Sequence, residues 1–360
     1  SPVRVLAVLC ALGLLGAACG GKSKGDAAPP EPTATTNSST TTTGVPPPEA
    51  PKEPLTGLPS GDPAALSRPA LVVKIDNADA GNCADSARPQ AGIDQADVVY
   101  DILVEGITRY AAVFHSKMPE VIGPVRSARS SDIDIVAQLD TPLLAWSGNN
   151  SNVGDELADA KDMFVNVGHS SKAGSNFYRD KERCAPHNLM VNPADLYEFA
   201  KGQGGAPTPI FQYRAPGESL PPSAQAMPGV RLTTGQEVVY AWNATTSSWD
   251  RIQKRSPHLA ADGKQISPAN VVALEVDYRP SSTPGSPRAV TVGEGPAHVY
   301  SDGKLVDGTW KRDDPAAPWT LVDPSGAPIK LTPGTTWVEL QQIGKVEALD
   351  AAGLAKFVER

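Results

Sequence analysis

A proline- and threonine-rich segment near the start of the chain limits what the rest can fold into. Residues 29–54 contain eight prolines and seven threonines and almost no apolar side chains. Such a segment cannot bury a hydrophobic core, so we expect residues 19–54 to form a disordered tether. At about 3.1 Å per residue in the polyproline form, this tether reaches on the order of 100 Å. The folded part is therefore expected within residues 55–360.

An apolar run ahead of the tether predicts export. Residues 5–18 read VLAVLCALGLLGAA, follow Arg4 and lead into Cys19. The run is too short to span a bilayer comfortably, and the small residues before Cys19 resemble a bacterial lipobox. We therefore expect residues 1–18 to be a signal peptide. Cys19 is then expected to carry a lipid that anchors the protein on the extracytoplasmic face of the cell membrane. An ordinary secretory signal cleaved near the same position is the alternative.

The cysteines outside the signal predict one disulfide. Cys10 is removed with the signal and Cys19 is lipidated, which leaves Cys83 and Cys184. In an oxidising compartment such a pair is expected to form a disulfide. A closed loop of about 100 residues stabilises the fold by roughly 4 to 5 kcal/mol in the chain-entropy model. Two separate buried thiols are the alternative.

The overall charge argues against nucleic acid as a partner. The formal net charge is −8 and the isoelectric point is near 5.2, whereas nucleic-acid-binding domains normally carry a basic stripe. Length and a hydrophobic content of 40% leave room for two domains, each with its own core.

The first folded region, residues 55–202, is predicted to be a mixed α/β or α+β domain. Short runs rich in β-branched and aromatic residues predict strands over residues 70–76, 97–104, 107–114, 142–147 and 163–167. A helix is expected over residues 131–139, with a capping box formed by Ser131 and Asp134. Another is expected over residues 193–201, with Asn192 as its N-cap.

The second folded region, residues 230–360, is predicted to be rich in β-strands. It follows a connection dense in glycine and proline over residues 203–229. Turn residues between apolar runs predict hairpins over residues 237–253, 297–312 and 319–331. We expect a small β-sandwich or partial barrel, followed by an amphipathic helix over residues 346–358.

The segment GPVRSARSSDIDI, residues 123–135, predicts an anion-binding site. Arg126 and Arg129 stand ahead of the expected helix, whose unpaired N–H groups favour negative charge. Ser127 and Ser130 add hydroxyl donors, and the arginine fork suits phosphate or carboxylate.

A second polar segment is expected to complete this site. Within residues 177–189 the candidate ligand-binding residues are Arg179, Arg183, His187 and Asn188. The predicted disulfide would bring this segment to the loop that carries Arg88. The alternative is that these arginines pair with neighbouring acids and only hold loops in place, as many exposed ion pairs do.

Strand alternation adds three candidate catalytic residues, Asp101, Glu105 and His115. If residues 97–104 and 107–114 form a hairpin, these side chains share a polar face with Arg109, a further candidate for ligand binding. Such a face offers acid/base groups or a Mg²⁺ site; a solvated sheet face is the alternative. Residues 55–360 contain no H-E-x-x-H or P-loop motif, so the sequence indicates no resident metal or cofactor and no reaction class.

Several stretches of the chain resemble the YerB-like bacterial lipoproteins, a two-domain family of unknown function. The matching stretches include RPALVVKIDN, ARPQAGIDQADVVYDILVEGITRYAAVFHS, IGPVRSARSSDIDI, FYRDKERCAPHNL, NVVALEVDY, DGKLVDGTWKR and PGTTWVEL. The resemblance implies a lipid-anchored exported protein with a mixed first domain and a β-rich second domain. It brings no activity, substrate or disulfide.

Three functional classes remain open from the sequence. The leading hypothesis is a membrane-tethered envelope protein that binds an anionic, wall-related ligand. The alternative is a Mg²⁺-dependent phosphoryl-handling enzyme, loosely similar in residue types to the LytR-CpsA-Psr phosphotransferases, with Asp101 or Glu105 as base or metal ligand. A third is an envelope scaffold that docks a protein partner through its second domain.

Overall fold

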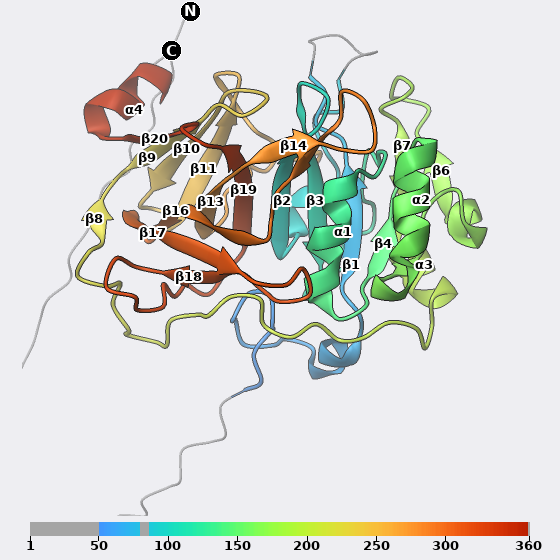
Figure 1. Cartoon of the computed structure of the whole chain (residues 1–360), viewed down its shortest axis with the longest axis horizontal. Coiled ribbons are helices and arrows are strands. Elements are labelled where there is room, and N and C mark those ends of the chain that lie inside the picture. The colour runs from blue at the N-terminus through green and yellow to red at the C-terminus, as the bar shows by residue number, and fades with distance from the viewer. Residues whose placement is uncertain (1–49, 80–85, 359–360) are drawn as a thin grey trace, which may run out of the picture. The chain divides into compact units, whose positions relative to one another are not determined.

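The computed structural model describes residues 50–79 and 86–358. Its centre is a mixed sheet of eleven strands to which both halves of the chain contribute (Figure 1). The first half supplies the strands β1 (Leu71–Ile75), β2 (Val98–Leu103), β3 (Thr108–Phe114), β4 (Leu143–Ala145) and β5 (Val165–Asn166). All five lie within predicted strands, which confirms the β-branched and aromatic pattern of these runs.

The first-half helices are α1 (Ser130–Val136), α2 (Ser151–Asp159) and α3 (Pro193–Phe199). Asn192 caps α3 by accepting a hydrogen bond from the Ala194 N–H, as predicted. The cap predicted for the helix near residue 131 is wrong. The N-cap is Arg129, whose N–H donates to Asp132 Oδ2 at 2.7 Å. Asp134 is not part of the cap, because it accepts hydrogen bonds from Arg288 and Thr291 of a distant segment.

The second half of the chain divides its strands between two sheets. Its contributions to the large sheet are β8 (Gln225–Ala226), β13 (Asn270–Val276), β16 (Gly293–Ser301), β17 (Lys304–Arg312), β18 (Thr320–Val322) and β19 (Thr336–Gln342). A separate five-stranded sheet contains β9 (Gly229–Leu232), β10 (Val238–Asn243), β11 (Ser248–Gln253), β12 (Ser256–Pro257) and β20 (Val346–Leu349). The pairs β6 (Phe177–Arg179) with β7 (Leu189–Val191) and β14 (Tyr278–Pro280) with β15 (Pro287–Ala289) form small ribbons.

The two halves join edge to edge within the large sheet. β19 pairs in parallel with β2, so that Thr336 lies opposite Val98 and Glu339 opposite Asp101. The five-stranded sheet packs on the second half's own strands of the large sheet, among them β13, β16 and β19, which agrees with the predicted sandwich. One layer of that sandwich continues into the first half of the chain. This joint places Asp101 in the interior, where the sequence of the first half alone gives no reason to expect it.

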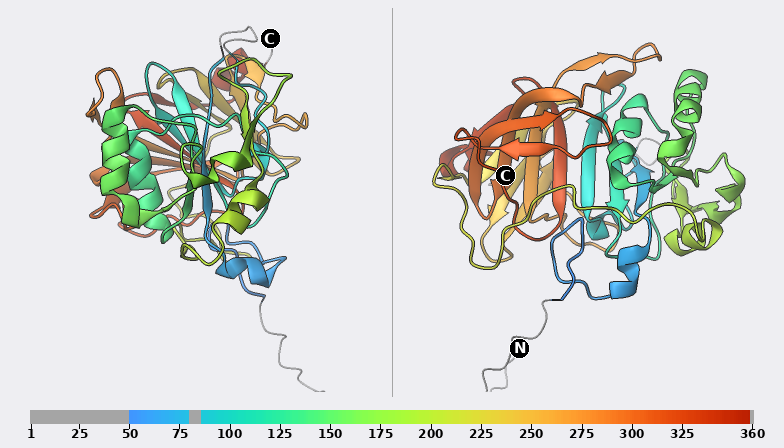
Figure 2. Two further views of the ribbon diagram at one scale, coloured as in Figure 1. Left: turned by 90° about the vertical axis from the view of Figure 1, so that its right-hand side faces the viewer. Right: turned by 60° about the horizontal axis from the view of Figure 1, so that its bottom comes forward.

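Two hydrophobic cores lie on opposite faces of the large sheet. In the first core, α1 and α2 pack against one face through residues such as Ile135, Val136 and Val153. In the second core, the five-stranded sheet and α3 pack against the opposite face through residues such as Tyr240 and Trp249. Figure 2 shows α1 and α2 gathered along one side of the sheet. The molecule thus has three layers, and most strands of the large sheet are buried on both faces.

The connecting and terminal segments are more ordered than their composition suggests. Within residues 203–229, Ile210 and Phe211 are buried in the first core. Glu53 is also buried and accepts a hydrogen bond from Ser60, so ordered contacts begin before residue 55. The helix predicted over residues 346–358 is shorter than expected: β20 comes first, and α4 spans only Ala351–Val358.

Candidate functional site

Polar residues gather where the parallel strands of the first half end. β4 runs parallel to β1, and both β1 and β2 run antiparallel to β3, so β1, β2 and β4 all end at one edge of the sheet. We call this the carboxyl edge. Asp76 follows β1 there, and Glu105 lies in the turn after β2. In open α/β sheets, ligands commonly bind at this kind of edge.

The segment that carries Arg126 and Arg129 crosses the carboxyl edge. The Arg126 N–H donates to the Lys74 carbonyl at 2.8 Å, and the Ser147 N–H donates to the Arg126 carbonyl at 3.0 Å. The Val125 N–H donates to the carbonyl of Leu189, the first residue of β7. These backbone bonds fix the segment between β1, β4 and β7, so the arginine side chains start from a rigid frame.

Asp76 brings the two predicted arginine-bearing segments together. Its Oδ2 lies 2.8 Å from Arg126 Nε and 2.6 Å from His187 Nδ1. The Asp76 carboxylate is buried, whereas the Arg126 side chain is 25% exposed. Arg126 and His187 therefore meet on a shared acid, although they are 61 residues apart in the chain.

Arg129 and Arg109 share a second acid, Glu105. Arg129 Nε lies 2.6 Å from Glu105 Oε1, and its Nη2 donates to Oε2 at 2.8 Å, which makes a bidentate pair. Arg109 Nη2 lies 3.8 Å from the same Oε2. Arg109 also donates to the Ser127 carbonyl. We call Arg109, Arg126 and Arg129 the arginine cluster.

Like charges lie close together within the arginine cluster. Burial lowers the pKa of Arg109 to about 10, and the neighbouring charges of Arg129 and Arg126 contribute to that shift. The Arg109 Nε and the Ser130 hydroxyl are both buried without a hydrogen-bond partner among the described residues. The pKa of Glu105 is also shifted, but in the direction that favours its charged form. Burial alone would raise its pKa, but hydrogen bonds and charge from Arg129 lower it to about 2.

The remaining candidates of the second segment do not reach the arginine cluster. Arg179 donates to Asn188 at 2.7 Å. Arg183 donates to the Ala87 and Pro89 carbonyls and lies 3.6 Å from Asp180, so it ties two loops together. Arg88 Nη1 lies 2.6 Å from Asp79. The structure thus brings His187 to the arginine cluster, whereas Arg88, Arg179 and Arg183 hold nearby loops.

His115 lies at the opposite edge of the sheet from Glu105. It follows β3, and its Nδ1 is 3.3 Å from Glu53 Oε2. The His115 N–H donates to Asp97 at 2.6 Å. Burial lowers the pKa of His115, which favours a neutral ring. The hairpin of β2 and β3 forms as predicted, but it does not bring His115 together with Glu105 and Arg109.

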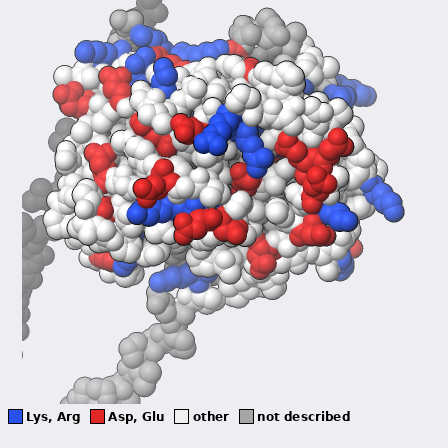
Figure 3. Space-filling model, in the orientation of Figure 1, with Lys and Arg blue, Asp and Glu red and all other residues white. Residues whose placement is uncertain are grey.

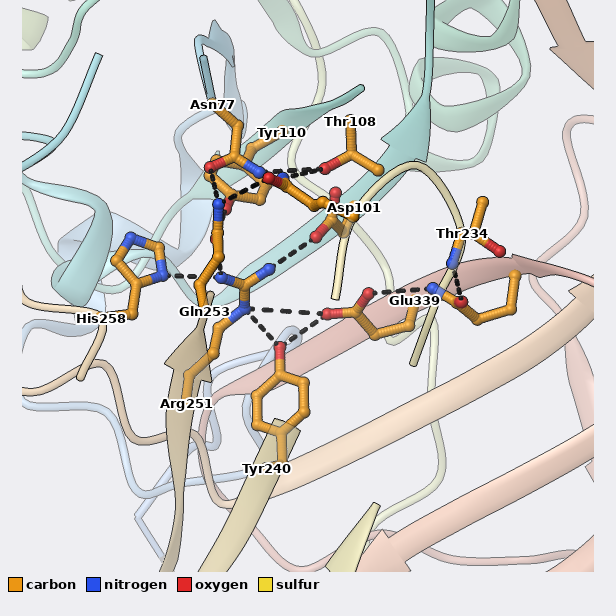
Figure 4. Close-up of polar contacts among 12 residues, drawn as sticks. Asn77, Asp101, Thr108, Tyr110, Thr234, Tyr240, Arg251, Gln253, His258 and Glu339 are labelled. Carbon is orange, nitrogen blue, oxygen red and sulfur yellow. Dashed lines mark hydrogen bonds and ion pairs between the residues drawn. The ribbon is translucent and has the colours of Figure 1, made fainter. Parts of the chain in front are cut away.

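Asp101 lies in a buried polar network that the sequence did not predict (Figure 4). Its Oδ2 lies 2.8 Å from Nη2 of Arg251, whose side chain is fully buried. The guanidinium also donates to Tyr240, which in turn donates to Glu339 at 2.6 Å. Arg251 stands 4.7 Å from the centre of the Trp337 ring, close enough for a cation–π contact. The face that carries Asp101 is therefore sealed by the five-stranded sheet.

This network reaches the candidate site through His258 and Gln90. Arginine can only donate, so Arg251 Nη1 donates to His258 Nδ1 at 2.8 Å. The other ring nitrogen then donates to Gln90 Oε1 at 2.9 Å. The Gln90 amide donates to the Asp76 carbonyl at 3.0 Å. Asp76 thus links the buried network to the arginine cluster.

One sequence signal could have indicated Arg251. In SWDRIQ, residues 248–253, strand alternation places Trp249, Arg251 and Gln253 on one face. Because a tryptophan on a strand favours the buried face, that pattern marks Arg251 as a buried cation that needs acids. It could not show that one of the acids is Asp101, 150 residues away.

An open hollow of about 580 Å³ lies beside Glu105 on the carboxyl edge. Gly106 forms part of its wall, and its other lining residues include Leu103, Tyr278, Pro280, Pro287 and Gln342. On the face drawn in Figure 3, basic and acidic side chains lie interspersed over the surface. The described residues contain no group of three or more His, Cys, Asp or Glu arranged to hold a metal ion.

Comparison with known proteins identifies the family. Residues 55–206 match the model of the N-terminal domain of a protein of unknown function (DUF3048), and residues 229–338 match the model of its C-terminal domain. The chain belongs to this YerB-like family. It is 26% identical over 322 residues to "Putative lipoprotein YerB" of Bacillus subtilis (strain 168), covering 85% of this chain and 89% of that protein. The family resemblance and the mixed fold with a β-rich second half are confirmed.

The fold is shared with a solved relative. A crystal structure of the YerB protein from Bacillus subtilis matches with a TM-score of 0.70 and 22% identity, covering 83% of this chain and all of that one. In the part of the YerB-like chain that the structure describes, no helix is long and apolar enough to cross a membrane. Cys19 and Cys83 lie outside the described residues, so lipidation and the disulfide with Cys184 stay predictions.

Proposed function

We propose that the protein is a lipid-anchored envelope protein that binds an anionic ligand at the arginine cluster. The observation that carries the proposal is the convergence of Arg109, Arg126 and Arg129 on one partly exposed edge of the sheet. Arg109 comes from the start of β3, whereas Arg126 and Arg129 come from the segment that crosses the carboxyl edge and ends at the cap of α1. Guanidinium groups match the oxygens of phosphate and carboxylate, so the ligand carries one of these groups.

Positive charge exceeds negative charge in this region. The arginine cluster and Lys74, which pairs with Asp132 at 2.7 Å, face three carboxylates, those of Asp76, Glu105 and Asp132. A buried excess of like charge is costly unless a partner neutralises it. The unfilled donors of Arg109 and Ser130 add to that cost. A bound anion supplies both the missing charge and the missing acceptors.

Glu105 occupies the position that we assign to the ligand's anionic group. Its side chain is 39% exposed, whereas Arg129 and Arg109 are 12% and 8% exposed. The arginines therefore approach from the protein interior and the carboxylate from solvent. Glu105 lies in a short turn beside Gly106, which has a positive φ of 76° and open space around it. An incoming anion displaces Glu105 by rotating its side chain, without moving the sheet.

The neighbouring hollow gives the rest of the ligand a place to lie. Its wall begins at Gly106, directly after Glu105, and its volume of about 580 Å³ falls in the range of small-molecule sites. Leu103, Tyr278 and Pro287 contribute apolar surface. We therefore expect a ligand whose anionic end meets the arginine cluster while an uncharged body contacts the hollow.

The proposal includes the location of the protein in the cell. The relative's name describes a lipoprotein, which agrees with the lipobox-like residues before Cys19. We propose that Cys19 carries the anchor, that residues 19–49 span the space between membrane and folded part, and that Cys83 pairs with Cys184. An anchored protein of this kind meets wall-related anionic polymers and lipid-linked precursors outside the cell.

Binding has more support than phosphoryl transfer. The alternative requires Asp101 or Glu105 as a base or metal ligand near the arginines. Asp101 is buried and bonded to Arg251, so a substrate cannot reach it in this conformation. Glu105, with a pKa of about 2, is a weak base at neutral pH.

Calorimetric titration of the lipid-free protein with inorganic phosphate, pyrophosphate and citrate tests the proposal. We expect saturable binding, and the preferred anion distinguishes phosphate from carboxylate recognition. Arg126→Ala with Arg129→Ala should weaken binding by at least about tenfold, because two charge-assisted contacts are lost. The matched control is Arg231→Ala with Arg255→Ala, which removes two arginines paired with Glu237 on the five-stranded sheet. No saturable binding of any of the three anions, or equal loss in both double variants, overturns the proposal.

A further inference from the structure

A second hollow lies where the two family domains meet. It is at the edge of the large sheet opposite the carboxyl edge that holds the arginine cluster. Its volume is about 430 Å³. One wall is the short 3₁₀ turn Ile93–Gln95, together with Lys117 after β3; the other is formed by residues 264–268. Thr335 and Trp337, at the start of β19, close the base. No part of this hollow is used by the proposed function.

The two walls are held together by backbone hydrogen bonds. The Ala261 N–H donates to the Gln90 carbonyl at 2.8 Å, and the Thr336 N–H donates to the Asp97 carbonyl at 3.0 Å. Ile93, Ile266 and Trp337 are buried beneath the hollow. The hollow is therefore preformed, and a ligand would not have to bring the domains together.

Two opposite charges face this hollow without pairing. Among the described residues, the Asp94 carboxylate and the Lys117 ammonium make no hydrogen bond and no ion pair to any side chain. The other two charged groups nearby, Lys264 and Asp262, pair with each other. Burial and the negative charge of Asp262 raise the pKa of Asp94, although its own backbone N–H and the charges of Lys264 and Lys117 act in the opposite direction. Gln95 adds an amide that is also without a partner in the described part of the chain.

We propose that this hollow binds a zwitterionic ligand of dipeptide size, with its ammonium group on Asp94 and its carboxylate on Lys117. A half-buried carboxylate that has no side-chain donor is poorly compensated, and a ligand's ammonium group supplies both a donor and the opposite charge. The separation between Asp94 and Lys117 leaves space for a ligand that spans them, because they line one hollow but lie beyond ion-pair distance of each other. Short peptides with free termini carry charges in this arrangement.

Ligand-detected NMR with the full chain tests the proposal, with alanyl-alanine as the probe. N-acetyl-alanyl-alanine lacks the ammonium group, and alanyl-alanine amide lacks the carboxylate. We expect alanyl-alanine to bind with a millimolar Kd and each blocked peptide to bind about tenfold more weakly, the effect of losing one charge-assisted contact. Asp94→Asn should abolish the preference for a free ammonium group, and Lys117→Met the preference for a free carboxylate.

Glu120→Gln is the control, because Glu120 is an exposed acid close to Lys117 in the chain but outside the lining of the hollow. Melting curves of each variant establish that it is folded. The proposal is overturned if alanyl-alanine does not bind the wild-type chain, if the blocked peptides bind equally well, or if Asp94→Asn keeps the preference. These outcomes are independent of phosphate binding at the arginine cluster, so either proposal can fail alone.

Discussion

Two arginine-centred regions of the molecule differ in how fully their charges are satisfied. In the buried network, Arg251 pairs with Asp101, donates to Tyr240 and His258 and lies over Trp337. In the arginine cluster, three guanidinium groups divide two nearby acids, Asp76 and Glu105, and leave a buried donor unused. In the sealed region every guanidinium nitrogen has a hydrogen-bond partner, whereas the other region is partly open and short of negative charge.

The difference separates structural arginines from arginines available for binding. A guanidinium whose three nitrogens all have partners inside a sealed layer is not accessible to a ligand and serves to join elements of the fold. Backbone bonds hold the segment that carries Arg126 and Arg129, and β3 holds Arg109, so the backbone of the arginine cluster does not depend on Glu105. Pairing with an acid is therefore not by itself evidence against binding; the exposure of that acid is what matters.

The largest expected effect is on stability, from Arg251→Met. Removing this cation leaves the buried Asp101 carboxylate uncompensated, and breaking such a pair typically costs about 3 to 5 kcal/mol. Chemical denaturation of the lipid-free protein measures the loss. Asp101→Leu in the same chain should recover part of it, because the uncompensated charge is then gone. A loss below about 1 kcal/mol for Arg251→Met would mean that the network does not hold the two halves together.

The next effect is a pH dependence of stability that arises from Glu339. Burial and the nearby Asp101 raise its pKa to about 8, above the value of about 4.3 expected in the unfolded chain. Between these values the folded state binds more protons, so stability falls as pH rises, with a slope approaching ~1.4 kcal/mol per pH unit. Denaturation curves from pH 5 to 8 should show this fall in the wild type and a flatter profile in Glu339→Gln. An equal slope in both proteins contradicts the assignment.

The strands and the arginine cluster were predictable from the sequence to different degrees. β1 to β5 follow from short apolar runs, and the α3 cap follows from Asn192 and Pro193. The approach of the segments that carry Arg126 and His187 was predicted. The acid that binds both residues, Asp76, was not predicted, because nothing local to residue 76 indicates which cations approach it. The position of Asp101 depends on the pairing of β2 with β19, a contact between residues more than 230 positions apart, which local patterns cannot show.

A smaller effect is expected from Glu105→Gln, which removes the proposed internal occupant of the arginine cluster. Because Glu105 is partly exposed, its pairs are weak, and their loss should raise phosphate affinity by up to about fivefold. Glu198→Gln, which breaks an exposed pair with Lys201 elsewhere, should change nothing. Unchanged or weaker phosphate binding in Glu105→Gln would show that Glu105 does not compete with the ligand.

The most direct measurement of the central claim follows the arginine side chains themselves. In a phosphate titration monitored through the arginine Nε–H signals by NMR, the account predicts saturable shifts for Arg126, Arg129 and Arg109, with one common Kd. The signal of Arg251 should stay in place throughout. Absence of saturable shifts in the arginine cluster, or shifts of the same size at Arg251, would contradict the distinction between the two regions and the binding function with it.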